Sequence, residues 1–598
     1  MCGIIGYIGK NNAIKRVING LKNLEYRGYD SAGIAFVYQN ELKIKKEIGR
    51  IVNLEQTLSK EETSSLAIGH TRWATHGGVN QTNSHPHHQG SITLVHNGII
   101  ENYATLKEQL QKLGYSFKSD TDSEVACAYI DYLYSKEKDI LKTLTQATTI
   151  LEGSYALGII VNQDYNTLYA LRKDSPLIIG LGLEENFIAS DVPAILDYTN
   201  KYYLLDDLDI AIITKDKVNI YNNLKEVTKE IQSYDFSLNV RDKQGYEHYM
   251  LKEIHEQSNI IRNLSQDYNS KEKILRNLPD LSSYNKINIV ACGSAYHAGI
   301  VGKYLIEEYG NIPVDVDIAS EFRYKKLFLD KHTLVILISQ SGETADTLAC
   351  LRIAKKYGCK TLGIINVEGS SIAREVDEVI YTKAGIEVAV ATTKGYLTQT
   401  FILSLLALNL GIRNNTLTEK NLEEIFDNLS KLPIIIDNIL GNNRTDIANI
   451  LCNYEDIYFI GRNIDYASSL ESSLKLKEIS YIHSDTYAAG ELKHGSIALI
   501  DKLTPVIATI TDPNTASKTI SNVKEVKARG AYVIVLTTTK LEIPTDCYDE
   551  IITLETTAKL FQPILNIIPM QLIAYNVAKL RNCDIDKPKN LAKSVTVE

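Results

Sequence analysis

Short apolar runs mark the N-terminal third of the chain, and in several of them apolar and polar positions alternate, which is typical of half-buried strands. Six runs predict strands, at Ile4–Ile8, Ala32–Val37, Ser65–His70, Ile92–Asn97, Ala156–Val161 and Thr167–Arg172. Apolar residues at helical spacing predict helices at Ala13–Leu24, Tyr103–Leu113 and Ser123–Leu133. Because the strands form clusters rather than alternating strictly with helices, the pattern up to about residue 235 predicts a layered α+β domain.

The pattern changes beyond residue 280. Continuous apolar runs bounded by Gly and Ser alternate with helices, which predicts parallel sheets covered on both faces. Strands are predicted at Ile287–Ala291, Leu334–Ile338 and Lys360–Ile365, and again at Ile457–Gly461, Pro505–Ile510 and Tyr532–Leu536. Gly293 and Gly461 recur at a spacing of about 170 residues, which indicates a duplicated α/β unit. Between the two patterns, Tyr246–Leu264 predicts a helix.

Composition narrows the class of protein. Of the 598 residues, 44% are hydrophobic and 23% are charged, and the net charge of -9 argues against nucleic acid as a partner. The eight cysteines lack the paired spacing of a zinc ribbon and fit a reducing compartment. No signal-peptide pattern precedes Cys2, and the most apolar later run, Phe401–Leu410, is shorter than a membrane span. We therefore expect a cytoplasmic protein without a membrane partner.

Cys2 is the first chemical candidate. Removal of the initiator Met1 would leave a cysteine with both a thiol and a free α-amine. An α-amine titrates near pH ~7.7–8.0 and can act as a base, while a thiolate attacks carbonyl carbon readily. A cysteine at position 2 taken alone is also compatible with no function at all.

Histidine and Asn-Gly blocks follow in the same third. Six of the twelve histidines lie between His70 and His96, but they lack the spacing of a metal site and favour polar loops around a small-molecule pocket. Asn97 and the Gly98 N–H could form an oxyanion hole, although Asn-Gly is also typical of a hairpin turn. Asp120 or Thr121 could cap the helix that follows.

Together these blocks resemble N-terminal-nucleophile glutamine amidotransferases. The blocks, in the order found in that family, are Cys2-Gly3, Leu24–Gly33, His70–Gly77, His96–Gly98 and Thr121-Asp122. The resemblance implies that Cys2 attacks the glutamine carboxamide while Asn97 and Gly98 hold the oxyanion. It implies that Arg72 binds the α-carboxylate and Asp122 the α-ammonium, and that the pocket is lined by Trp73, Thr75 and His76.

A second candidate site lies in the α/β region. Ser339–Thr344 follows a strand and opens a helix, an arrangement that binds phosphate, although it is also typical of a plain helix cap. It lacks the spacing and the lysine of a nucleotide P-loop. The turn Ala291–Ser294 is predicted at the same carboxyl edge of the sheet, where ligands bind in open α/β folds. Glu471, Lys475 and Glu478 share one helical face, as they also would in a surface salt-bridge ladder.

These turns resemble sugar isomerase (SIS) domains, and the whole chain is similar to the glutamine–fructose-6-phosphate aminotransferase (isomerising) family, the glucosamine-6-phosphate synthases. Further similar blocks are Gly245–Ile254, Ala319–Tyr324, Lys475–Ser480, Ala488–Gly495 and Asn590–Glu598. The resemblance implies a sugar-phosphate site made by Ser294, Ser339, Gln340, Ser341 and Thr344, with Val390 against the sugar. It implies a Schiff base on Lys593, proton transfer by Glu478 with help from Lys475, and ring opening by His494.

The resemblance also implies an architecture: an α+β N-terminal-nucleophile glutaminase sandwich followed by two α/β SIS domains with parallel sheets. The expected segments are a glutaminase at 1–235, a helical connector at 236–280, SIS domains at 281–425 and 440–585, and a catalytic tail at 586–598. The expected substrates are L-glutamine and D-fructose 6-phosphate, the expected assembly is a homodimer, and no cofactor or metal is implied.

One departure from the family and two rival functions bear on this interpretation. The family usually has Thr-Ser after Ala-Cys-Gly, where this chain has Ser294-Ala295, and Ala295 lacks a hydroxyl for phosphate. A sugar-phosphate sensor with decayed sites would not need Cys2, Glu478, His494 or Lys593. A fructosamine-forming or deglycating isomerase would not need the glutamine pocket.

Overall fold

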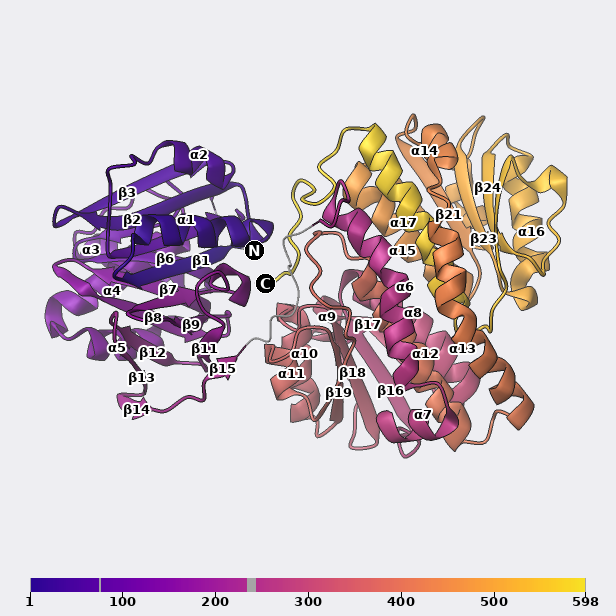
Figure 1. Cartoon of the computed structure of the whole chain (residues 1–598), viewed down its shortest axis with the longest axis horizontal. Coiled ribbons are helices and arrows are strands. Elements are labelled where there is room, and N and C mark those ends of the chain that lie inside the picture. The colour runs from indigo at the N-terminus through magenta and orange to yellow at the C-terminus, as the bar shows by residue number, and fades with distance from the viewer. Residues whose placement is uncertain (1, 75–76, 234–242, 597–598) are drawn as a thin grey trace. The chain divides into compact units, whose positions relative to one another are not determined.

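The computed structural model describes residues 2–74, 77–233 and 243–596, so Met1, Thr75 and His76 lie outside the described residues. The chain divides into two compact units, residues 1–239 with 592–598 (unit 1) and residues 240–591 (unit 2). In Figure 1, residues 2–233 of unit 1 run from indigo to purple and unit 2 runs from magenta to yellow.

Unit 1 contains two antiparallel sheets. The first sheet is formed by β1 (Gly3–Gly9), β2 (Ser31–Tyr38), β3 (Glu41–Ile48), β4 (Leu66–Arg72), β9 (Ile178–Leu181), β10 (Glu185–Ala189), β11 (Lys201–Leu204) and β15 (Gln232–Ser233). The second is formed by β5 (His87–Gln89), β6 (Ile92–Ile100), β7 (Gly153–Val161), β8 (Asp164–Lys173), β12 (Asp209–Ile213), β13 (Val218–Asn222) and β14 (Lys225–Val227). In the described part of the unit, the strand orders are β15-β11-β9-β10-β1-β4-β2-β3 and β14-β13-β12-β8-β7-β6-β5.

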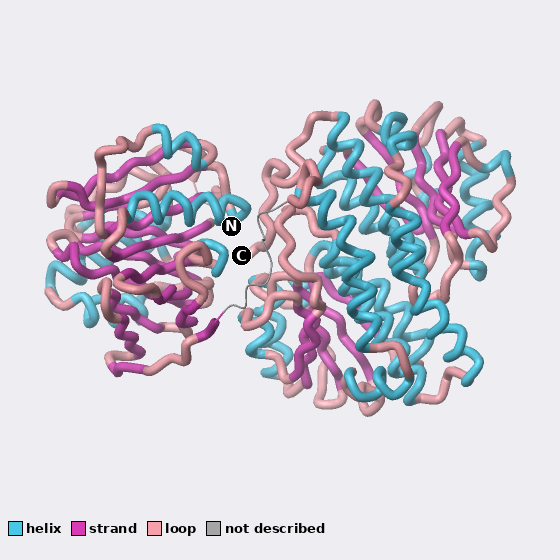
Figure 2. The backbone as a smooth tube through the Cα atoms, viewed as in Figure 1, coloured by secondary structure: helices cyan, strands magenta, loops and turns pink. Residues whose placement is uncertain are grey.

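Strand β1 shows why the sheets stack. Its side chains alternate, so that Ile4 and Ile8 enter the core between the two sheets, while Ile5 and Tyr7 pack toward helix α1 (Ala13–Leu24). Helices α1 and α2 (Ile51–Gln56) pack on the first sheet. Helices α3 (Tyr103–Lys112), α4 (Asp122–Glu137) and α5 (Ile140–Ile150) pack on the second. The predicted α+β sandwich is confirmed, and Figure 2 shows its strands as magenta layers.

Unit 2 contains two parallel sheets. The first is formed by β16 (Lys286–Ala291), β17 (Val314–Ile318), β18 (Thr333–Ser339), β19 (Lys360–Ile365) and β20 (Glu378–Tyr381). The second is formed by β21 (Asp456–Gly461), β22 (His483–Ala488), β23 (Pro505–Ile510), β24 (Tyr532–Thr538) and β25 (Glu550–Leu554). Their orders, β17-β16-β18-β19-β20 and β22-β21-β23-β24-β25, are the same path repeated, which confirms the predicted duplication.

Helices cover both sheets of unit 2 (Figure 1). They are α6 (Tyr249–Asp267), α7 (Lys271–Asn277), α8 (Gly293–Leu305), α9 (Ala319–Phe322), α10 (Ala345–Lys356), α11 (Ser371–Glu375), α12 (Lys394–Arg413), α13 (Glu419–Leu440), α14 (Thr445–Leu451), α15 (Ile464–Ser480), α16 (Pro513–Lys527) and α17 (Gln562–Leu580). Helices α8, α12, α15 and α17 contact one another and share one hydrophobic core with both sheets.

Helix α12 corrects one sequence argument. The apolar run Phe401–Leu410 belongs to a helix of 20 residues, which is long and apolar enough to cross a membrane. The argument that this apolar segment is too short to span a membrane was therefore wrong. The apolar window of the helix is 100% buried, so within the described chain α12 is the core helix of an α/β unit.

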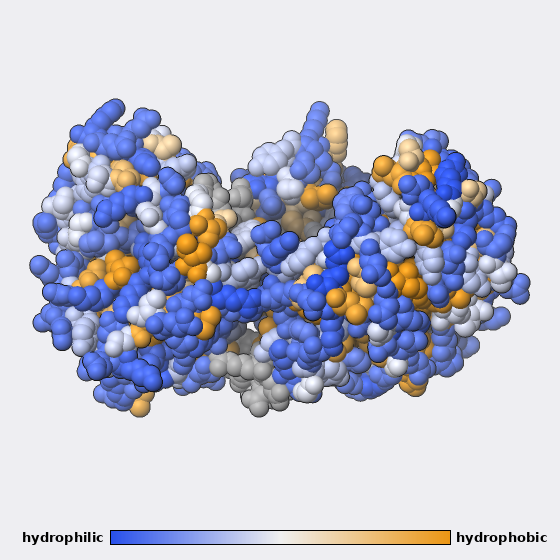
Figure 3. Space-filling view, turned by 90° about the horizontal axis from the view of Figure 1, so that it is seen from above, coloured by the Kyte–Doolittle hydropathy of each residue, from blue (hydrophilic) through white to orange (hydrophobic). Residues whose placement is uncertain are grey.

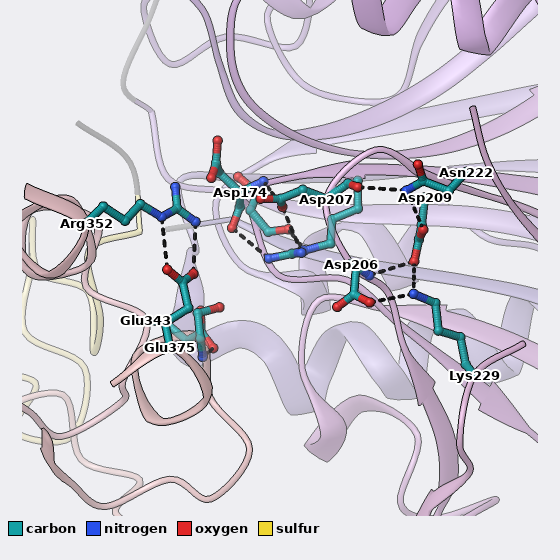
Figure 4. Close-up of polar contacts among 12 residues, drawn as sticks. Asp174, Asp206, Asp207, Asp209, Asn222, Lys229, Glu343, Arg352 and Glu375 are labelled. Carbon is teal, nitrogen blue, oxygen red and sulfur yellow. Dashed lines mark hydrogen bonds and ion pairs between the residues drawn. The ribbon is translucent and has the colours of Figure 1, made fainter. Parts of the chain in front are cut away.

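Ion pairs join separate segments within each unit (Figure 4). In unit 1, Lys229 lies 2.6 Å from both Asp206 and Asp209. In unit 2, Arg352 of α10 lies 3.1 Å from Glu375 of α11. On the face drawn in Figure 3, hydrophilic residues predominate and apolar residues form small separate patches, as is usual for a protein surface.

Candidate active sites

Cys2 lies immediately before β1, where the strand is paired with β4 so that Gly3 faces Thr71. The backbone N–H of Trp73 points at the Cys2 thiol, with N and Sγ 3.3 Å apart. Burial raises the pKa of the thiol, and the Trp73 N–H and the charge of Arg72 act in the opposite direction. A thiol with a raised pKa needs a base beside it, which is the task expected of its own α-amine.

The side chain of Asn97 is held in one orientation. Its Nδ2 donates to the Cys2 carbonyl at 3.0 Å, and its Oδ1 lies 3.1 Å from His70 Nε2. His70 Nε2 is also 3.0 Å from the carbonyl of His96, and because a carbonyl can only accept, Nε2 must carry the proton. Burial lowers the pKa of His70 to about 3, so the ring is neutral. His70 therefore turns the NH₂ end of Asn97 toward Cys2.

Gly98 cannot be replaced at this position without strain. Its φ is +127°, and a Cβ would lie 2.0 Å from the carbonyl oxygen of Ser154 on β7. Asn97 and Gly98 both lie inside β6, paired with Ala156 and Tyr155. The alternative of an ordinary hairpin turn is therefore wrong. The Asn97 amide lies beside Cys2, where it provides one donor of the kind that an oxyanion hole requires.

Arg72 and Asp122 supply charges to the same site. Arg72 is buried at the end of β4, and its guanidinium donates to the carbonyls of Gly77 and Gly78 at 3.1 Å. Burial lowers the pKa of Arg72, and the nearby charges of Cys2 and Asp122 oppose that effect. The buried Asp122 is the first residue of α4 and accepts the Ile100 N–H at 2.8 Å.

The structure shows which residue caps the N-terminus of α4. Thr121 is the N-cap, and its hydroxyl accepts the N–H of Glu124. Of the two candidates Asp120 and Thr121, Thr121 is therefore the capping residue, and the cap sets the position of Asp122 at the first turn of the helix.

Four histidines of this block, His70, His85, His87 and His96, form a packed column instead of the expected polar loops. The rings of His70 and His85 stack with centroids 4.1 Å apart, and those of His85 and His87 lie 4.8 Å apart. The His96 N–H donates to His85 Nδ1 at 3.2 Å. Burial holds the pKa values of His85 and His87 well below the ordinary range, so these rings are neutral. In the described chain, no group of three or more His, Cys, Asp or Glu side chains is placed to hold a metal ion.

The predicted phosphate loop follows β18. The Ser339 hydroxyl accepts the Gly342 N–H at 3.0 Å and lies 3.0 Å from the Thr344 hydroxyl. Gly342 has a φ of +66°, and a Cβ there would lie 1.9 Å from Ser370 Oγ. Thr344 is the N-cap of α10, but its side chain makes no capping hydrogen bond. The first turn of α10 therefore keeps N–H donors for an anion, as at other phosphate sites.

The second isomerase domain differs at the equivalent carboxyl edge of its sheet. There the carboxylate of Asp465, on α15, accepts the N–H groups of Thr511 and Asp512 at 2.7 and 3.1 Å. Burial raises the pKa of Asp465 to about 6. A carboxylate of the chain itself occupies the donors that could bind phosphate, so the loop after β18 is the better anion site.

Lys475 lies in a buried charge cluster that joins the two domains. Its Nζ is 2.5 Å from Glu478 and 3.3 Å from Glu471, and it donates to the Ser294 hydroxyl at 3.2 Å. Burial lowers the pKa of Lys475, but the two carboxylates outweigh burial and raise the pKa above its ordinary value. Since Lys475 and Glu471 are fully buried, the alternative of a surface salt-bridge ladder is wrong.

The first isomerase domain contributes two residues to this cluster. The Ser294 hydroxyl donates to Glu471 at 2.7 Å, and His297 Nδ1 lies 2.8 Å from the other oxygen of Glu471. Ser294 therefore lies with the acid–base residues, and its hydroxyl hydrogen is already used there. The neighbouring Ala295 packs in the hydrophobic core. His297 was not anticipated, because only the fold brings α8 against α15.

Three predicted residues of the sugar site remain: Val390, His494 and Lys593. The Val390 N–H donates to the carbonyl of Asp586 at 3.0 Å, and the Asp586 carboxylate caps the start of α6. His494 is exposed on the short helix η4 (Leu492–His494), and its ring has no hydrogen bond to a residue that the structure describes. Lys593 is half-buried in the segment 592–598, which groups with unit 1.

Family models define the class of protein. The model described as a glutamine amidotransferase domain matches residues 70–197, and the SIS domain model matches residues 280–409 and 450–581. The chain is thus a glutamine amidotransferase joined to a pair of sugar isomerase domains.

Relatives identify the family. The chain is 48% identical to glutamine–fructose-6-phosphate aminotransferase (isomerizing) of Clostridium tetani and 47% identical to that of Caldanaerobacter subterraneus subsp. tengcongensis, over 100% of both chains in each case. The solved C-terminal domain of the Francisella tularensis glucosamine-fructose-6-phosphate aminotransferase covers 58% of this chain and 100% of its own, with 36% identity and a TM-score of 0.54. The chain belongs to the glutamine–fructose-6-phosphate aminotransferase (isomerising) family.

Proposed function

We propose that this enzyme transfers the amide nitrogen of L-glutamine to D-fructose 6-phosphate, giving D-glucosamine 6-phosphate and L-glutamate, through the residues described above. Cys2 Sγ attacks the glutamine carboxamide and its proton passes to the α-amine that removal of Met1 exposes. Asn97 Nδ2 and the Gly98 N–H hold the oxyanion, ammonia leaves, and water hydrolyses the thioester. The observation that supports this assignment best is the Asn97 amide, which His70 turns toward Cys2.

Arg72 and Asp122 fit the two ends of the glutamine backbone. A guanidinium suits a carboxylate because it can donate two parallel hydrogen bonds, and the Asp122 carboxylate suits an ammonium. Trp73, Thr75 and His76 complete the proposed pocket.

The sugar half of the reaction is assigned to unit 2 and the tail. Ser339, Gln340, Ser341 and Thr344 bind the phosphate, and Val390 and Ser294 border the sugar. Lys593 forms the Schiff base at C2 of the open-chain sugar, and Glu478 moves the proton between C1 and C2. Lys475 is held charged by its two carboxylates and stabilises developing negative charge rather than acting as the base.

His494 is proposed to open the sugar ring. Its exposure suits a homodimer in which this histidine enters the site of the partner subunit. We also infer a cytoplasmic location, since both substrates are metabolites and the free cysteines fit a reducing compartment.

Alanine variants test the assignment. In Cys2→Ala, glutamine-dependent formation of glucosamine 6-phosphate is expected to vanish while ammonia-dependent formation persists. In Lys593→Ala, both are expected to vanish. Cys452→Ala, which removes another half-buried thiol outside either site, serves as the matched control. Glutamine-dependent synthesis by Cys2→Ala would refute the role of Cys2.

A further inference from the structure

Residues 581–591, the tail segment, lead from the end of α17 to the proposed Schiff-base residue Lys593. All of them are described, and none belongs to a helix or strand. A segment of this kind usually lies on the surface and is mobile. Here Ile585 is packed in the hydrophobic core of unit 2, and Pro588 is buried too. The tail segment therefore follows a fixed path over unit 2.

Asp586 joins the tail segment to two other parts of unit 2. Its Oδ2 and Oδ1 accept the backbone N–H groups of Tyr249 and Met250, at 3.0 and 2.9 Å, in the first turn of α6. The N-cap of that helix, His248, makes no capping hydrogen bond with its side chain, so the cap comes from the far end of the sequence. The carbonyl of Asp586 in turn accepts the Val390 N–H at 3.0 Å.

The tail segment also contacts α15, the helix that carries Lys475 and Glu478. The backbone N–H of Lys589 donates to the hydroxyl of Tyr481 at 2.7 Å, and the Lys589 ammonium lies 4.3 Å from the centre of the Tyr481 ring. Tyr481 is the C-cap residue of α15 and follows Glu478 by three residues, a rise of about 4.5 Å along the helix. The tail segment is thus anchored at the end of the helix that holds the proposed proton-transfer group.

Chain length limits how far Lys593 can lie from this anchor. Four residues separate Lys589 from Lys593, and four extended residues span about 14 Å. Asp586 is seven residues from Lys593, and Leu580, at the end of α17, is thirteen. The effective concentration of a tethered group falls roughly as the −3/2 power of the tether length. Moving the last anchor from Lys589 to Asp586 therefore lowers it about 2.3-fold, and moving it to Leu580 about 6-fold.

We propose that Asp586 and Tyr481 are positioning residues that hold the tail segment so that Lys593 reaches the sugar. The inference rests on the proposed function, in which Lys593 forms a Schiff base. In that step the Lys593 nitrogen bonds to C2 of the open-chain sugar, and the carbonyl oxygen leaves with the two amine hydrogens as water. Neither positioning residue touches the substrate, and each acts on the local concentration of the Lys593 amine.

Reductive trapping in the full-length enzyme tests the inference. Cyanoborohydride transfers a hydride to the imine and converts it to a stable secondary amine, so fructose 6-phosphate becomes attached to Lys593, where peptide mass spectrometry detects it. Tyr481→Phe removes only the hydroxyl and is expected to slow trapping and ammonia-dependent synthesis about twofold. Tyr481→Phe/Asp586→Ala is expected to slow both by roughly two- to sixfold, because the packing of Ile585 still holds part of the segment.

Ser270→Ala is the matched control. It removes the N-cap hydrogen bond of α7, where Ser270 accepts the Lys273 N–H at 3.3 Å, and is expected to leave trapping unchanged. Glutamine hydrolysis is expected to be unchanged in all three variants.

The outcomes separate this inference from the proposed function. Adduct formation on Lys593 at the wild-type rate in the double variant overturns the positioning role alone. An equal slowing in Ser270→Ala also overturns it, because the effect then belongs to any weakened helix cap. No adduct on Lys593 in the wild type overturns the Schiff base of the proposed function, and this inference with it.

Discussion

Replacing His70 with phenylalanine tests how the oxyanion hole is built. Phenylalanine keeps a ring that can stack on His85, 4.1 Å away, but removes the Nε2 atom that lies 3.1 Å from Asn97 Oδ1 and 3.0 Å from the His96 carbonyl. The carboxamide of Asn97 then loses one of two contacts that distinguish its oxygen from its nitrogen, and the hydrogen bond from Nδ2 to the Cys2 carbonyl remains. In a fraction of molecules the oxygen would face the developing oxyanion and repel it.

The size of the effect follows from the worth of the contacts. One hydrogen bond contributes about 0.5–1.5 kcal/mol net, so His70→Phe is expected to lower kcat for glutamine hydrolysis by roughly 2- to 13-fold. Removing the donor itself, in Asn97→Ala, takes away an oxyanion contact worth about 2.7–4 kcal/mol, a loss of roughly 10²–10³ in kcat.

Glutamate release measures glutamine hydrolysis, and ammonia-dependent synthesis of glucosamine 6-phosphate measures the isomerase alone. The isomerase rate is expected to stay at the wild-type value in both variants, and the exposed His88 provides the control His88→Phe. Wild-type glutamine hydrolysis by His70→Phe would refute the orienting role. A loss as large as that of Asn97→Ala would show that His70 does more than orient the amide.

Three further changes address other parts of the molecule. Gly342→Ala places a Cβ 1.9 Å from Ser370 Oγ at a φ of +66°, so the KM for fructose 6-phosphate should rise in steady-state assays while glutamine hydrolysis is unchanged. Lys475→Met leaves the fully buried Glu471 without its ammonium partner, so unit 2 should lose about 3–5 kcal/mol of stability in denaturant unfolding. Synthesis from either nitrogen source should also stop in this variant. Unchanged stability would contradict the buried charge cluster. The folded pKa of His70, about 3, lies below its unfolded value of about 6.5, so this contribution to stability is present above pH ~6.5 and is lost as the pH falls toward 3. Fluorescence of Trp73, the single tryptophan, should report unfolding of unit 1 at lower denaturant at pH 5 than at pH 7, with a smaller difference in His70→Phe.

Much of the fold could be predicted from local patterns. The apolar runs of β1, β18 and β23 reflect burial on two faces, and a hydrophobic pattern in the sequence indicates burial. Short elements such as β14 and β15 were missed because a strand of two or three residues has no period to detect. Their existence depends on the neighbouring strands, which a local pattern does not contain.

The site was predictable where a residue type alone implies chemistry, as with Cys2 and Asn97. It was not predictable where a partner comes from a distant element. His70 shares a face of β4 with Leu66 and Ile68, which pack between the sheets, and this buried position was the available clue to a structural histidine. The burial of Lys475 depends on α8, which precedes it by more than 160 residues, so local spacing could not separate a buried cluster from a surface ladder.

The transfer of the glutamine amide nitrogen, released at Cys2, to the sugar can be followed directly with isotopes. The full-length enzyme is given fructose 6-phosphate, glutamine labelled with ¹⁵N in its amide and an excess of unlabelled ammonium, and the nitrogen of the glucosamine 6-phosphate is read by mass spectrometry. The account predicts predominantly ¹⁵N product from the wild type and only ¹⁴N product from Cys2→Ala. Product nitrogen that follows the ammonium pool in the wild type, or ¹⁵N product from Cys2→Ala, would contradict it.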